Sequence, residues 1–361
     1  MNTLRLKYGL CFPAFIAVTF FLMSCSGDPV PDTLSPAVKQ TFSFLPEKPQ
    51  FVMYANFRNM RAAEFWKTNI SDSMFAAENT FGSMLNVFKS ATGVSVSSGL
   101  DEMFFANSWT GENAIILKGS FDRNKFNSYT GSDTTIRKTV NPDGTVVYTH
   151  VPSSLMFFFR DNYTLCASNY GKQIDFMKQV NDSALSGLAT NAGMMEAING
   201  IMFKENIWMI TSEKMFIRGI LANLTDVKRG RNVEKEIFPD SLESRDSDSL
   251  SKQEDILLNK MYEKINSLSV NVKMKKDLTF NLQFEAVDIE SAVYIKKLLN
   301  GIILFAKLSA SAKKDVNSKQ MAEILDKLEI NTYNTNTIAT VEITGEDIGI
   351  LRAEKDLPGL K

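Results

Sequence analysis

Hydrophobic and polar residues follow two different periods along this chain, and the two periods predict strands and helices respectively. Short runs rich in β-branched and aromatic residues, with polar and apolar positions in alternation, predict strands. Runs whose apolar residues recur three or four positions apart predict helices. The predicted strands are 51–56, 102–109, 113–119, 134–140, 145–151, 155–160, 163–169, 206–213, 267–276, 278–286, 328–334 and 337–344. The predicted helices are 58–66, 73–93, 121–129, 171–181, 214–224, 288–310, 318–328 and 345–355.

These elements recur in a similar order in the two halves of the chain. Each half reads as a strand, a helix, two strands, a helix and two further strands, with FVMYAN matching IWMITS. We therefore predict an α+β protein made of two similar units, each an antiparallel sheet with helices packed on one face. The first unit is expected over residues 41–200 and the second over 201–361, with an exposed, charged and serine-rich insertion at 228–255.

Three local patterns sharpen this expectation. Gly93 is suited to end a helix and Asn141-Pro142-Asp143-Gly144 to form a hairpin turn, because glycine accepts a positive φ. In strands 267–276 and 278–286, apolar residues alternate cleanly with polar ones, which predicts one covered face and one wet face. By contrast, LMFFFR at 155–160 is apolar on both sides, which predicts either a strand buried on both faces or a phenylalanine-lined partner surface.

The first 25 residues carry a different signal. Arg5 and Lys7 precede a run without charge from Tyr8 to Met23, and that run is too short to span a bilayer comfortably. The sequence predicts a secretory signal peptide over residues 1–24. The last four of these 25 residues, Leu22-Met23-Ser24-Cys25, resemble the lipobox of bacterial lipoproteins.

That resemblance implies that Cys25 is lipidated and becomes the first residue of the mature chain. Two or more acyl chains anchor a protein stably where one does not. By resemblance to lipoprotein sorting, Ser26 after the cysteine favours the outer membrane of the cell envelope. Residues 25–40, with Pro29, Pro31 and Pro36, are expected to form the lipidated cysteine and an extended tether.

The net charge argues against nucleic acid as a partner, and the cysteine content argues against a disulfide. Without Arg5 and Lys7 the mature chain has 38 basic and 41 acidic residues, a formal charge of −3, so no strong field attracts nucleic acid. Cys166 is the one cysteine that is neither removed with the signal nor lipidated, which excludes an intramolecular disulfide.

Candidate catalytic and metal-binding residues are few. The single histidine, His150, rules out a His-rich metal site, and no nucleophile elbow, P-loop or dinucleotide fingerprint occurs. Cys166 lies between apolar neighbours and is expected to be a buried, inert thiol. Asp246 and Asp248 lack the glycine and terminal glutamate of a calcium loop. We therefore expect no catalytic residues, no metal site and no cofactor.

The opening of the globular part, LPEKPQFVMYANF, is similar to that of a group of bacterial envelope lipoproteins, from which no site residue carries over. The resemblance implies a membrane-anchored envelope protein. The leading hypothesis is a non-catalytic protein-interaction or assembly module with an envelope protein partner. The alternative is a carrier for an apolar ligand such as a lipid.

Overall fold

The computed structural model describes residues 28–70, 88–108, 111–226, 262–312 and 322–348. The chain divides into two compact units, Met1–Val30 and Pro31–Lys361, and every element named below belongs to the second. The predicted signal peptide, Cys25 and the insertion 228–255 with Asp246 and Asp248 lie outside the described residues.

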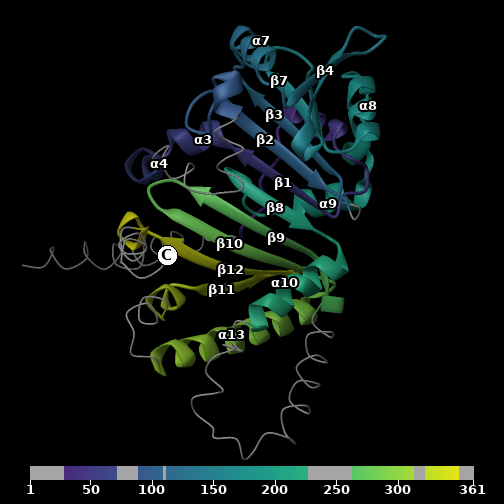
Figure 1. Cartoon of the computed structure of the whole chain (residues 1–361). Coiled ribbons are helices and arrows are strands. Elements are labelled where there is room, and N and C mark those ends of the chain that lie inside the picture. Colours follow the sequence, from purple (N-terminus) through teal and green to yellow (C-terminus); the bar gives the residue numbers. More distant parts are fainter. Residues whose placement is uncertain (1–27, 71–87, 109–110, 227–261, 313–321, 349–361) are drawn as a thin grey trace, which may run out of the picture. The chain divides into compact units, whose positions relative to one another are not determined.

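Twelve strands form one antiparallel sheet in the described part of the chain (Figure 1). Its strand order is β11-β12-β10-β9-β8-β1-β2-β3-β7-β6-β5-β4, and this confirms the predicted α+β class with antiparallel pairing. The strands are β1 (Phe51–Asn56), β2 (Leu100–Asn107), β3 (Asn113–Gly119), β4 (Ile136–Val140), β5 (Val146–His150), β6 (Leu155–Phe159), β7 (Thr164–Ser168), β8 (Ile207–Thr211), β9 (Ile265–Met274), β10 (Leu278–Ala286), β11 (Glu329–Tyr333) and β12 (Asn336–Ile343).

Helices cover both faces of this sheet, whereas one face was expected. One face packs against α2 (Pro36–Thr41), η1 (Phe42–Phe44), α8 (Gly171–Gln179), η3 (Gly187–Thr190) and α9 (Ala192–Gly200). The opposite face packs against α3 (Phe57–Ala62), α4 (Glu64–Asn69), α7 (Arg123–Ser132), α10 (Lys214–Asp226) and α13 (Ile289–Ala312). We call these the α9 face and the α13 face. The remaining 3-10 turn is η2 (Val151–Ser153).

The two predicted units share one sheet and one core. Strand β1 of the first half pairs with β8 of the second, and both Tyr54 and Trp208 belong to the same buried cluster. The predicted boundary between residues 200 and 201 falls inside that cluster, since Ile198 and Ile201 both line it. Outward from the β1–β8 pair the strand order is β2-β3-β7-β6-β5-β4 on one side and β9-β10-β12-β11 on the other. Descent of the halves from one duplicated unit stays a prediction.

The last part of the expected tether, 25–40, belongs to the folded core, because α2 begins at Pro36. Leu34 and Val38 are buried in the core of the α9 face, and Ser35 caps α2 by accepting the amide of Val38 at 3.3 Å. Serine followed by proline is a helix start, because proline fits the first helical position. The three prolines favoured an extended tether, so this helix start was not recognised. Leu34 before the cap and Val38 inside α2 then attach the segment to the core.

The middle of the polar face of β9 and β10 is buried, where a wet face was expected, and Lys273, Thr279 and Glu285 on the same face are half-buried. Asn271, Asn281 and Gln283 are buried on the α9 face. On the α13 face of the same strands, Phe280 is 37% exposed. The alternation of apolar and polar residues in β9 and β10 predicts that their two faces differ. It does not show which face other segments of the chain cover.

Strand β6 is covered on both sides, as one of the two predictions for LMFFFR required. Phe158 packs into the α9-face core, and Phe157 and Phe159 pack edge to face on Phe126 of α7 at 5.8 and 4.9 Å. Phe158 is therefore a core residue, and Phe157 and Phe159 are half-buried against the core of the other face.

Candidate functional site

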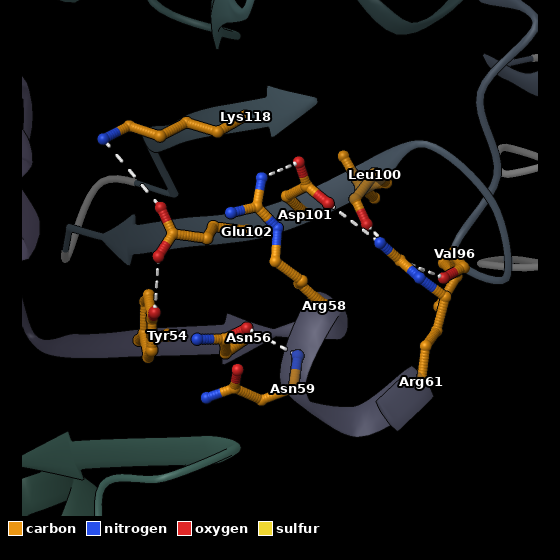
Figure 2. A network of polar contacts seen from close by, with 10 residues as sticks. All are labelled: Tyr54, Asn56, Arg58, Asn59, Arg61, Val96, Leu100, Asp101, Glu102 and Lys118. Atoms are coloured by element: carbon orange, nitrogen blue, oxygen red, sulfur yellow. Dashed lines mark hydrogen bonds and ion pairs between the residues drawn. The ribbon is translucent and has the colours of Figure 1, made fainter. Parts of the chain in front are cut away.

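A network of charged and polar side chains joins the start of β2 to β1, β3 and α3 (Figure 2). The Tyr54 hydroxyl donates to Glu102 Oε1 at 2.7 Å, and Lys118 Nζ lies 3.9 Å from Glu102 Oε2. Lys118 also donates to Thr41 Oγ1 at 2.6 Å and lies over the ring of Phe104. This half of the network ties the C-terminal end of α2 to the sheet.

The second half of the network centres on Asp101. Arg58 Nη2 and Arg61 Nη2 donate to its two carboxylate oxygens at 2.6 and 2.8 Å. Arg61 Nη1 also donates to the carbonyls of Val96, at 2.9 Å, and Leu100. Because Arg58 and Arg61 lie on α3, the arrangement fastens that helix to the irregular start of β2, where the pairing register shifts.

The electrostatics of this network favour stable ion pairs over proton transfer. The hydrogen bond from Arg58 is the largest cause that holds the pKa of Asp101 below its usual value. Burial, and then the hydrogen bond to Glu102, raise the pKa of Tyr54, so the phenol stays protonated. Burial lowers the pKa of Lys118 despite the attraction of Glu102. Asp101 and Glu102 are neighbours in sequence but bind different partners (Figure 2).

His150 forms a local pair with serine. Its Nδ1 lies 2.7 Å from Ser153 Oγ, three residues further along the chain. Asp133 interacts with His150 electrostatically, but its Oδ1 accepts hydrogen bonds from the Thr135 amide and hydroxyl at 2.8 and 2.6 Å. No described carboxylate accepts a hydrogen bond from His150, so a Ser-His-Asp triad is not assembled there.

Cys166 is buried and free, as the sequence predicted. Burial is the main cause that raises the pKa of its thiol to about 12. The thiolate that would act as a nucleophile is therefore scarce at neutral pH.

The described residues contain neither a metal-site cluster nor a helix fit to span a membrane. Within 28–70, 88–108, 111–226, 262–312 and 322–348, no three His, Cys, Asp or Glu side chains gather as a metal site would require. No helix in the same ranges combines the length and hydropathy needed to cross a membrane.

The outer surface of α13 carries an apolar stripe that the sequence did not single out. Its large apolar members are between 40% and 61% exposed, and they follow helical spacing with Lys297 in the middle: Ile289, Val293, Leu304 and Leu308. The opposite side of α13 is buried through Ala292, Ile295 and Leu299. Helix α13 is thus apolar on two sides, and its inner side alone is covered by the described chain. The available signal was the recurrence of apolar residues on both sides of this helical segment, interrupted on the outer side by Lys297.

A second apolar feature runs across the middle of the α13 face. Five half-buried side chains on β2, β1, β8, β9 and β10 stand side by side in register: Phe105, Met53, Met209, Val270 and Leu282. We call them the sheet row.

Comparisons with known proteins give structural likeness alone. No family model matches the chain, and no curated protein matches it significantly. Among solved structures, crystal form III of TP0453 has a TM-score of 0.43 and 9% identity, over 89% of this chain and 99% of that chain. Crystal form I of TP0453 has a TM-score of 0.42 and 9% identity, over 91% of this chain and 98% of that chain. Crystal form IV has a TM-score of 0.41 and 8% identity, over 86% of this chain and 96% of that chain. At these scores and identities the likeness supports no argument about function.

Proposed function

We propose that this chain is a lipid-anchored protein of the bacterial envelope, held in the outer membrane through Cys25, that docks an envelope protein and performs no catalysis. The lipobox resemblance of residues 22–25 supports the anchor. The single observation that carries the docking role is the exposed apolar stripe of α13.

The stripe defines the chemistry of the partner. Large exposed apolar patches on soluble folds mark interaction sites. Lys297 is exposed in the middle of this stripe, so a matching partner surface is apolar and carries an acidic group opposite Lys297. The polar network around Asp101 and Glu102 is internally paired and serves the fold in this proposal.

Docking is tested by photo-crosslinking in cells of the source organism. A photoreactive amino acid at Leu304 or at Leu308 is expected to give the same discrete crosslinked product. The matched control is Val140, which is 64% exposed on the edge strand β4. A Leu304→Glu/Leu308→Glu variant with a probe at Val293 should lose the product. Products of equal yield from Val140, or persistence in the double variant, would contradict docking through α13.

Anchoring is tested separately. Cys25→Ser should move the protein from the membrane fraction to the soluble fraction and remove the acyl mass from the intact protein. Retention of the acyl mass in Cys25→Ser would contradict the anchor while leaving the docking result to stand.

The alternative function is the carriage of an apolar ligand. It is supported by the sheet row, whose apolar side chains are only half buried across five neighbouring strands. Native mass spectrometry of the full-length protein, purified in detergent from its own host, distinguishes the two functions. A lipid-sized additional mass that is lost in Met209→Lys, but retained in Leu304→Glu, would favour the carrier.

A further inference from the structure

Three neighbouring side chains on the α9 face are buried without hydrogen-bond partners in the described part of the chain. They are Trp208, Ser269 and Asn271, and the unpaired atoms are Trp208 Nε1, Ser269 Oγ and both Asn271 side-chain atoms, Nδ2 and Oδ1. Trp208 stands directly opposite Asn271 in the β8–β9 register. Ser269 is two residues from Asn271 on β9, so all three point to the same face of the sheet.

The segment after α9 runs over this part of the sheet. Gln283, directly opposite Ser269, accepts the Met202 amide at 2.9 Å and donates to the Gly200 carbonyl at 2.9 Å. On the other side of Asn271, Lys273 lies 5.8 Å from the ring centre of Phe203. Residues 200–203 are therefore attached on both sides of Asn271, and they close the site from solvent.

The buried side chain of Lys204 holds residues 200–203 in place through hydrogen bonds. Lys204 Nζ donates to the carbonyls of Asp32, at 2.6 Å, and Asn199, at 2.9 Å, and also to that of Ile201. The Lys204 amide donates to Asp32 Oδ2 at 2.8 Å. Residues 200–203, which cover Trp208, Ser269 and Asn271, are therefore held by hydrogen bonds to Gln283 of the sheet and to Lys204.

The unpaired atoms determine what chemistry would satisfy them. A buried polar group without a partner costs stability, and four such atoms on neighbouring residues of one sheet face are rarely left unpaired in folded proteins. The indole and the amide nitrogen supply donors, the amide oxygen supplies an acceptor, and the hydroxyl can do either. None of the three side chains is ionisable at neutral pH. The matching molecule is therefore small, uncharged, and able both to donate and to accept.

We propose that Trp208, Ser269 and Asn271 form a closed binding site for a small neutral hydroxyl-bearing molecule, of which water is the smallest member. The site lies on the opposite face of the sheet from α13 and is independent of the docking function. Ordered water and a small alcohol or polyol share this chemistry, and the experiment separates them.

A crystal structure of the full-length protein, together with native mass spectrometry, tests the proposal. We expect ordered density within hydrogen-bond distance of Asn271 and at least one of Trp208 and Ser269. A native mass equal to that of the lipidated chain would identify the occupant as water, and a reproducible excess mass would identify an organic molecule. Side chains that pair with one another around a dry site would overturn the proposal.

The thermal unfolding midpoint of an Asn271→Leu variant gives an independent test, because an occupied site and an empty site predict changes of opposite sign. If a bound molecule satisfies Asn271, leucine removes its partner and lowers the midpoint, and Ser269→Ala does the same to a smaller extent. If the atoms are unsatisfied, leucine relieves the cost and raises the midpoint, which would overturn the proposal. Asn266→Leu, an exposed position on the same strand, is the matched control and should leave the midpoint nearly unchanged.

Discussion

Phe42 and Trp208 pack edge to face with 6.1 Å between their ring centroids, although 165 positions separate them in the chain. Phe42 also meets Phe104 at 6.0 Å, and all three rings are fully buried. The segment just after the predicted tether therefore closes the core where the two halves of the sheet join.

Phe42→Ala tests this central position. Removing a buried phenyl ring leaves a cavity and costs about 3–5 kcal/mol of unfolding free energy. Urea unfolding followed by tryptophan fluorescence measures the loss. Val151→Ala, at an exposed position, is the control and should change the free energy by less than about 0.5 kcal/mol. A loss below about 1 kcal/mol for Phe42→Ala would show that the segment is not part of the core.

Lys204 predicts an increase of stability with pH in the alkaline range. Burial lowers its pKa from 10.5 to about 8 in the folded protein, and the attraction of Asp32 only partly opposes this. Because the folded pKa lies below the unfolded one, the unfolded state binds the extra proton between these values. The contribution of Lys204 to stability therefore rises between about pH 8 and pH 10.5.

The measurement is urea unfolding at intervals from pH 7.5 to 10, for the wild type and Lys204→Met. The difference in free energy between the two proteins isolates the contribution of the lysine, because other groups titrate in both. We expect the unfolding free energy of the wild type to rise relative to that of Lys204→Met as the pH rises. A difference that stays flat or falls would contradict the lowered pKa.

Asp101 predicts a loss of stability in acid. Its folded pKa is depressed, chiefly by the hydrogen bond from Arg58, so its contribution is present above pH 3.8 and disappears as the pH falls through the depressed value. Asp101→Asn should lower the unfolding free energy at pH 7 by about 1–3 kcal/mol, because Arg61 loses its carboxylate partner while partly buried. The gap between the variant and the wild type should narrow below pH 4 in urea unfolding. Arg58→Ala is the weaker comparison, since 73% of the Arg58 side chain is exposed.

Cys166 should resist thiol reagents in the native state. Its burial and its pKa of about 12 leave little thiolate to react. A Cys11→Ser/Cys25→Ser variant isolates this thiol, and intact mass after incubation with a maleimide reports its labelling. We expect labelling in urea and none over the same time in buffer. Rapid labelling in buffer would place Cys166 in a segment that opens readily.

The sequence predicted the elements far better than their assembly. Periodicity located the hairpins and α13 because strand and helix patterns are local, and Gly93 and Gly144 do adopt the positive φ that their turns require. Nothing local reveals that β1 pairs with β8, because that pairing joins residues more than 150 positions apart. For the same reason the polar side of β9 was assigned to solvent, although the segment after α9 covers it.

The network in Figure 2 shows the same limit at the level of single residues. Asp101 and Glu102 could be recognised as a carboxylate pair, but their partners lie on β1, β3 and α3. Only the tertiary fold brings Tyr54, Arg58 and Lys118 to them. The unpaired atoms of Ser269 and Asn271 were equally hidden, since polar strand residues usually face water.

The hydrogen bonds between Asp32 and Lys204 would have a mechanical consequence in the proposed form of the protein that is anchored through Cys25. Six residues separate Cys25 from Asp32, so the anchor and the first fixed residue can be at most about 24 Å apart. A pull on the membrane end would therefore reach Asp32 with little slack and pass directly through Lys204 to the carbonyls of Asn199 and Ile201. Tension at the anchor would load the cover of the buried polar site before it loaded any strand of the sheet.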